Sequence, residues 1–162
     1  MQSLDKALVL AALRHELEAQ LALAQAAQQH AQAGATHEES KPENDKDTRA
    51  IEASYLARGQ ARRVVELEEA VVKVNALVPR AFGDELPVAL GAVVELEHAA
   101  GSLWYLLAPA GGGLSITVGN LVLTVVTPQS PVGQALLGRR LGDDVDIRTP
   151  QGIRQCSIAG LC

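Results

Sequence analysis

Two long segments in which apolar residues recur at alternating spacings of three and four constrain this chain more than any other feature. Such spacing lines apolar side chains along one narrow stripe of a helix, and two stripes of this kind pack against each other. Apart from one glutamine in each segment the seam positions are all apolar, and they are Leu10, Leu13, Leu17, Gln20, Ala24, Ala27 and Ala31, then Ala50, Ala53, Ala57, Gln60, Val64, Leu67, Val71 and Val74. The pattern predicts a hairpin of two antiparallel helices over residues 1–77.

The register of this hairpin follows from the place where the chain turns back. A turn near residues 40 and 41 pairs seam positions whose numbers sum to about 81, so that Leu17 faces Val64 and Gln20 faces Gln60. Two facing amides can satisfy each other in a seam; in the alternative, both glutamines point to solvent. At about 1.5 Å per residue the arm is on the order of 40 Å long, more than is needed to cover a small second domain.

The segment 36–49 is the expected tip of the arm, and it is acidic. Five carboxylate side chains fall within ten residues, from Glu38 to Asp47, and Pro42 stops helix propagation. Such a segment can be a functional acidic tip. It can equally be a solvated turn, since Asp45 and Asp47 also suit the first turn of the second helix.

Composition changes near residue 80, where Ala, Leu, Gln and Glu give way to Val, Gly and Pro. Residues 78–87 form the expected linker, and residues 88–162 a second domain of short alternating segments. Strands are predicted at 92–97, 103–108, 114–118, 121–126, 145–148 and 153–158, with a short helix at 131–137. We therefore expect an α+β chain, with an antiparallel coiled-coil hairpin followed by a small antiparallel β domain that carries one short helix.

Charge and composition exclude several classes of protein. The chain carries 14 basic and 19 acidic side chains, a formal charge of −5, whereas binding naked nucleic acid by bulk electrostatics needs clustered Lys and Arg. Its aromatic residues are Tyr55, Phe82, Trp104 and Tyr105, too few for a base-stacking platform. No run approaches the roughly 18 apolar residues of a membrane span, and no secretory signal is visible. We expect a cytoplasmic protein with no membrane partner.

The cysteines and histidines show no spacing typical of a metal site. Cys156 and Cys162 lie six residues apart without histidines at ligand spacing, so we expect two reduced thiols. The four histidines are scattered along the chain.

The segment 130–145, with the sequence SPVGQALLGRRLGDDV, combines signals that start and stop a helix. Ser130 is a good N-cap, Pro131 suits the first helical position, and Gly138 suits the residue just past the end. We call residues 130–145 the signature segment.

The signature segment, together with Pro150 and Gly152, resembles the C-terminal signature of the bacterial GreA/GreB transcript cleavage factors. In architecture the resemblance covers nearly the whole chain, because that family also has an N-terminal helical hairpin with an acidic tip. It implies an FKBP-like C-terminal domain that docks on the rim of the RNA polymerase secondary channel. The docking region that it implies contains Ser130, Pro131, Gly133, Leu137, Gly142 and Asp143.

The resemblance also implies a chemistry for the tip. In the family the coiled coil enters the channel, and two tip acids help to hold a second Mg²⁺, shared with the polymerase, for cleavage of backtracked RNA. Glu43 and Asn44 match the family's Glu-Asn pair, whereas Ser40 stands where the family has Asp. Glu39 lies one residue away and Glu38 two, and either can supply the second carboxylate. We take Glu43 and Glu39 as the candidate catalytic and Mg²⁺-holding pair.

Arg58 and Arg62 lie four residues apart on one face of the second helix, with Arg63 beside them. The resemblance makes Arg58 and Arg62 candidates for contact with the nascent RNA 3′ end. In the alternative they belong to a solvated face on which an arginine pairs with Glu66 one turn on.

These observations keep three classes of function open. The first is an accessory factor, not itself an enzyme, that binds RNA polymerase and stimulates cleavage of backtracked RNA; the general functions implied are transcription regulation and DNA binding. The second is a non-cleaving paralogue that occupies the channel and regulates or inhibits transcription. The third is a prolyl isomerase, suggested only by the fold of the second domain, for which Trp104, Tyr105 and Phe82 are too few to line a pocket. We expect a monomer.

Overall fold

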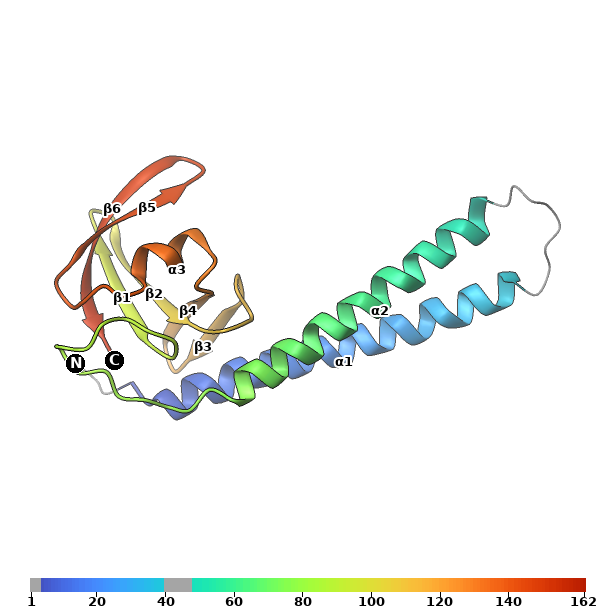
Figure 1. Ribbon diagram of the computed structural model, residues 1–162, viewed down its shortest axis with the longest axis horizontal. Coiled ribbons are helices and arrows are strands. Elements are labelled where there is room, and N and C mark those ends of the chain that lie inside the picture. Colours follow the sequence, from blue (N-terminus) through green and yellow to red (C-terminus); the bar gives the residue numbers. More distant parts are fainter. Residues whose placement is uncertain (1–3, 40–47) are drawn as a thin grey trace. The chain divides into compact units, whose positions relative to one another are not determined.

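The computed structural model describes residues 4–39 and 48–162, which form three helices and six strands (Figure 1). The chain divides into two compact units. One is Leu17–Val71, and the other is Val72–Cys162 together with the start of the first helix as far as Glu16.

The two long helices are α1, Lys6–Glu39, and α2, Thr48–Asn75. Within the unit Leu17–Val71 they lie side by side, as Figure 1 shows. Every one of the predicted seam positions is buried or half-buried, whereas most positions between them are exposed. The predicted helical hairpin is therefore confirmed. Residues spaced alternately by three and four lie on one side of a helix, and in both helices this is the side that is buried.

The register of the hairpin agrees with the predicted one to within a helical turn. Gln20 Oε1 accepts a hydrogen bond from Arg63 Nη2 at 3.4 Å. Arg63 lies less than one turn of about 3.6 residues beyond Gln60, the predicted partner. Gln20 and Gln60 are both half-buried. The hydrogen-bond donor to Gln20 is therefore the guanidinium of Arg63, where the sequence predicts the amide of Gln60. A guanidinium is the stronger donor of the two because it is charged.

The second part of the chain folds into one six-stranded sheet with the strand order β3-β4-β2-β1-β6-β5. Its strands are β1 Val93–His98, β2 Gly101–Leu107, β3 Ser115–Val118, β4 Leu121–Val126, β5 Asp144–Thr149 and β6 Gly152–Leu161. All six lie where the alternation of apolar residues predicts them, although β6 runs on to Leu161 instead of ending at 158.

The prediction of a purely antiparallel sheet is wrong at one pair of strands. β2 and β4 run parallel, with Trp104 opposite Leu123 and Leu107 opposite Val126. The cause is the position of β3, which turns tightly into β4 at Gly119 (φ 61°) and lies on the outer side of β4. The chain has then reversed twice between β2 and β4, so the two neighbours point the same way.

The main core of this domain lies on the face of the sheet that α3, Pro131–Leu136, covers. Its buried members are Phe82, Val88, Ala92, Val94, Leu96, Leu107, Val126, Leu136, Val145, Ile147, Cys156, Ile158 and Leu161. Tyr105 packs against this core, whereas its neighbour Trp104 points to the opposite face because side chains alternate along a strand. The aromatic residues are thus divided between two faces, which does not favour a prolyl isomerase pocket.

Candidate functional site

The signature segment begins with a capped helix, as its sequence predicts. Ser130 Oγ accepts a hydrogen bond from Gly133 N at 3.0 Å and donates one to the carbonyl oxygen of Thr127 at 2.8 Å. Pro131 follows in the first turn of α3. One hydroxyl therefore ties the first turn of α3 to the end of the preceding loop.

Gly133 has a role that the capping signals do not predict. A Cβ atom on this residue would lie 1.9 Å from the carbonyl oxygen of Thr127. The same oxygen also accepts a hydrogen bond from Ser130 N at 3.0 Å. Only a residue without a side chain fits here, since the loop passes directly over the helix backbone.

Beyond α3 the chain is held to Val88, the first residue after the linker, by two reciprocal backbone bonds. Gly138 N donates to Val88 O at 2.9 Å, and Val88 N donates to Arg139 O at 2.7 Å. Gly138 has φ 79°, the left-handed conformation that ends helices. Leu137, just before it, keeps 47% of its surface exposed. The start of the second domain and the end of α3 are thus joined directly through the backbone.

Gly142 and Asp143 form the turn that leads into β5. Gly142 N donates to Ile158 O at 2.9 Å, and Ile158 N donates to Asp143 O at 2.9 Å. Asp143 Oδ2 accepts from Arg140 N at 2.9 Å, which closes the turn from its other side. These contacts give both residues a clear structural role.

The structure therefore brings the six residues of the implied docking region together on the two ends of α3 and the turn that follows. Gly133 is buried, Ser130 and Asp143 are half-buried, and Pro131, Leu137 and Gly142 are exposed. Of the six, Leu137 alone offers an exposed large apolar side chain. Its neighbours Arg139 and Arg140 are exposed as well.

The candidate tip residues fall largely outside the described residues. Glu38 and Glu39 are the last two residues of α1, and the structure does not describe their side chains. Ser40 and Glu43 lie outside the described residues. The acidic pair Glu43 and Glu39 thus stays a prediction from the sequence.

The candidate RNA-contacting arginines differ in their surroundings. Arg62 Nε lies 3.0 Å from Glu66 Oε1, the pairing that the alternative interpretation predicts. Both side chains are largely solvent-exposed, and such pairs contribute about 0.3–0.5 kcal/mol to stability. Arg58 is exposed, and no ion pair with another described residue is recorded for it. Of the two, Arg58 is the more available for a partner.

A cluster around Lys6 has no signal in the sequence. Lys6 Nζ donates to Arg80 O at 2.5 Å and to Gly91 O at 2.9 Å, and lies 4.1 Å from the centroid of the Phe82 ring. Burial lowers the pKa of Lys6 to about 8. Because two of its partners are main-chain carbonyls, no pattern of side chains predicts the cluster.

Comparison with known proteins bears on the C-terminal domain first. Residues 119–160, from the start of the β3–β4 turn to β6, match the sequence model described as "Transcription elongation factor, GreA/GreB, C-term". This range contains the whole signature segment with its cap, its obligatory glycine and its closing turn. This part of the chain is therefore similar to the C-terminal domain of the GreA/GreB family.

Two relatives illustrate the range of the family. The chain is 26% identical to "Transcription inhibitor protein Gfh1" of Thermus thermophilus over 125 residues, 73% of each chain. It is 27% identical to "Transcription elongation factor GreA" of Syntrophus aciditrophicus over 122 residues, 74% of this chain and 69% of that one. A crystal structure of Gfh1 from Thermus thermophilus aligns with 92% of this chain and 94% of its own, at 24% identity and a TM-score of 0.40.

Other expectations from the sequence can be compared with the described residues. Cys156 and Cys162 are both free thiols. Across residues 4–39 and 48–162, no three His, Cys, Asp or Glu side chains are grouped so as to hold a metal ion. Within the same ranges, each helix falls short of the length and apolarity that crossing a membrane requires.

Proposed function

We propose that the chain binds RNA polymerase through its C-terminal domain and presents its helical hairpin to the secondary channel. The observation that carries this proposal is the family match over residues 119–160, which coincides with α3 and its ordered flanking turns. The names of the relatives, a transcription inhibitor and a transcription elongation factor, support it. In this proposal the protein is an accessory factor, and the catalytic activity belongs to the polymerase.

The finer proposal is that the tip stimulates cleavage of backtracked RNA. Glu39 ends α1, and Glu43 follows in the sequence between the end of α1 and the start of α2. Carboxylate oxygens are the ligands that Mg²⁺ takes, and the ion, when shared with the polymerase, would activate water and stabilise the leaving oxygen. The contribution of this chain is to hold the ion through Glu43 and Glu39, with Arg58 and Arg62 available to the RNA 3′ end.

A second candidate, a channel-occupying factor that does not stimulate cleavage, has its own support. The identity to the transcription inhibitor Gfh1 is 26%, almost the same as the 27% to GreA. Ser40 also replaces the Asp that the family carries at the tip. Serine offers a neutral hydroxyl in place of a hard anionic ligand, which weakens any site for Mg²⁺.

One experiment separates the two candidates. The full chain is added to a stalled, backtracked polymerase complex, and RNA length is followed on a gel over a range of Mg²⁺ concentrations. Shortened RNA that disappears with Glu43→Gln supports cleavage stimulation, because glutamine keeps the shape and removes the charge. Unshortened RNA with slowed elongation supports the non-cleaving regulator.

Docking is tested separately by capture of polymerase on the immobilised full chain. Leu137→Asp should weaken binding by about tenfold or more, since it places a charge on an apolar contact. Val122→Asp is the matched control, because Val122 is an exposed apolar residue of the same domain in β4. Failure of the unaltered chain to bind polymerase would overturn the proposed function itself.

A further inference from the structure

The linker, residues 78–87, carries an exposed leucine that the implied docking region does not include. Leu86 keeps 36% of its surface exposed, although large apolar side chains are usually buried. The docking region implied by the sequence resemblance begins only at Ser130. The place of Leu86 relative to that region depends on how the linker is held.

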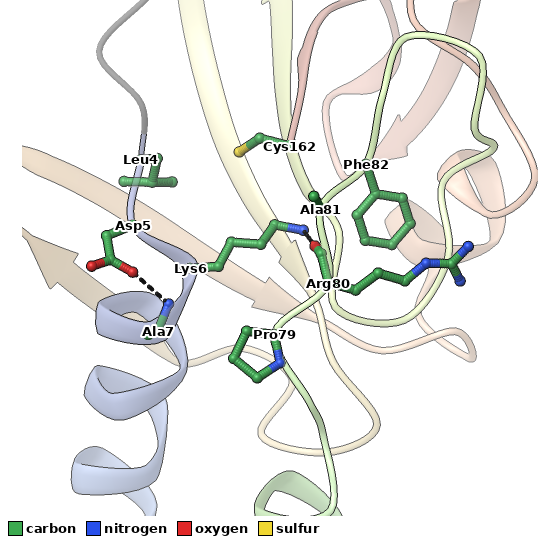
Figure 2. A pocket seen from close by; sticks show the side chains of 9 residues that line it. All are labelled: Leu4, Asp5, Lys6, Ala7, Pro79, Arg80, Ala81, Phe82 and Cys162. Atoms are coloured by element: carbon green, nitrogen blue, oxygen red, sulfur yellow. Dashed lines mark hydrogen bonds between the residues drawn. The ribbon is translucent and has the colours of Figure 1, made fainter.

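The first half of the linker is anchored to the start of α1 and to the core of the second domain. Lys6 Nζ donates a hydrogen bond to Arg80 O at 2.5 Å, and Figure 2 shows this side chain extending from α1 to the linker backbone. The Phe82 ring lies 4.1 Å from the same amine, and Phe82 is a buried member of the core. Lys6 thus acts as a structural ammonium that holds residues 80–82 in place.

The second half of the linker is anchored to the chain that follows α3, on both sides of Leu86. Before Leu86, the carbonyl oxygen of Glu85 accepts a hydrogen bond from Arg140 Nη1. After it, Val88 exchanges backbone hydrogen bonds with residues 138–139, at 2.9 Å and 2.7 Å. Leu86 is one residue from the first anchor and two from the second, so its Cα lies within about 7 Å of both anchoring residues.

The anchors place Leu86 beside Leu137, the exposed apolar residue of the docking region. Leu137 directly precedes Gly138, which is bonded to Val88, and it keeps 47% of its surface exposed. Arg139 follows and is exposed, and no hydrogen bond or ion pair of its guanidinium with another described residue is recorded. Apolar side chains bordered by an arginine are typical of protein interfaces.

We propose that Leu86 and Leu137 together form the apolar centre of the surface that binds RNA polymerase, with Arg139 at its edge. This inference rests on the proposed function and extends the docking surface from α3 to the linker. The partner surface that fits has an apolar side chain that contacts both leucines and a carboxylate that meets the guanidinium. Arg140 is a positioning residue, because its bond to Glu85 holds the linker beside the end of α3.

The first test measures the dissociation constant of the full chain for RNA polymerase by fluorescence titration. Leu86→Asp should weaken binding by about tenfold or more, whereas Leu86→Met keeps an apolar side chain and should stay within about threefold. Ile153→Asp is the matched control, since Ile153 is 67% exposed on β6 of the same domain, and it should stay within about twofold. Urea denaturation shows that each variant is folded.

A double-mutant cycle tests whether the two leucines contact the same partner side chain, and it uses alanine variants that introduce no charge. Leu86→Ala and Leu137→Ala should each weaken binding severalfold. The combined variant should weaken it by clearly less than the product of the two factors, because losing one leucine already loosens the partner side chain that both contact. A combined effect equal to the product, or no effect of Leu86→Ala, would overturn the proposal.

The positioning role is tested with Arg140→Ala, which should weaken binding severalfold. In the Leu86→Ala background the same change should have less than about a twofold further effect, because Arg140 acts through Leu86. An undiminished effect would show that Arg140 contacts the polymerase itself.

The outcomes also separate this inference from the proposed function. An unaltered chain that does not bind polymerase contradicts the proposed function and the inference with it. Binding that Leu137→Asp weakens and Leu86→Asp leaves unchanged overturns the inference alone, because the docking surface then ends at α3.

Discussion

Gly133 and Thr127 approach so closely that a Cβ atom on the glycine would lie 1.9 Å from the carbonyl oxygen of the threonine. That oxygen also accepts hydrogen bonds from the amide and the hydroxyl of Ser130, at 3.0 Å and 2.8 Å. The three residues therefore form a single unit at the start of α3. The serine holds the loop against the helix, and the glycine makes room for it.

Gly133→Ala should be among the most damaging single changes in the C-terminal domain. A backbone oxygen cannot move aside as a flexible side chain can, so we expect a loss of about 3 kcal/mol or more in the free energy of unfolding. Urea denaturation measures it. Ala135→Gly in the same helix is the control and should cost about 1 kcal/mol. Equal losses for the two variants would show that the close approach is relieved in solution.

Ser130→Ala should lower the free energy of unfolding by about 1 kcal/mol, because the change removes the helix cap. Ser130→Thr keeps the hydroxyl and should cost less than about 0.5 kcal/mol. Thermal unfolding of both variants checks the ranking. A threonine variant as unstable as the alanine variant would mean that the hydroxyl bonds contribute little.

Leu67→Ala should destabilise the hairpin by about 2–4 kcal/mol, because the side chain is buried in the seam and its loss leaves a cavity. Leu23→Ala is the control, since Leu23 is 73% exposed on α1, and it should stay within about 0.5 kcal/mol of the unaltered chain. Denaturation followed by helical circular dichroism makes the comparison. Similar effects at the two leucines would contradict the seam.

The stability of the chain should carry a contribution from Lys6 that rises with pH. The pKa of Lys6 is about 8 in the folded chain against 10.5 for an unperturbed lysine, so between these values the unfolded state binds more protons. Stability from this group therefore increases from about pH 8 to pH 10.5. Burial raises the pKa of Cys156 and Cys162, which acts in the opposite direction.

For that reason the measurement is the difference between the unaltered chain and Lys6→Met. The unaltered chain should gain stability relative to the variant as the pH rises from 8 to 10. A constant difference across this interval would show that Lys6 titrates at an ordinary pKa.

At the tip, Ser40→Asp should raise cleavage of backtracked RNA, because it supplies a second hard ligand where the family has one. Glu39→Gln tests whether the neighbouring residue already fills that role. If it does, its loss should reduce cleavage as much as Glu43→Gln. RNA shortening at limiting Mg²⁺ is the readout, and no gain from Ser40→Asp at any Mg²⁺ concentration would leave the non-cleaving regulator as the better description.

The spacing of apolar residues along the chain predicts the helices and strands well. Each of these elements buries only one face, so its apolar residues recur with the period of a helix or of a strand. It does not predict which strands become neighbours, and therefore it does not predict the parallel pair of β2 and β4. The same limit applies to Gln20, whose bond to Arg63 depends on how two helices rotate against each other. The cluster around Lys6 and the close approach of Gly133 to Thr127 are not predictable for a different reason, since their decisive partners are backbone carbonyls, which every residue possesses.

The seam of the arm changes from leucine and valine at one end to alanine at the other, and this has a consequence for local unfolding. Each alanine buries a single methyl group, so opening the distal turns of α1 around Ala27 and Ala31 exposes little apolar surface. Amide hydrogens there should exchange with solvent sooner than those around Leu13 and Leu17, whose side chains are fully buried. A partner that binds the arm around Ala27 and Ala31 can therefore change its conformation there at little cost to the stability of the rest of the molecule.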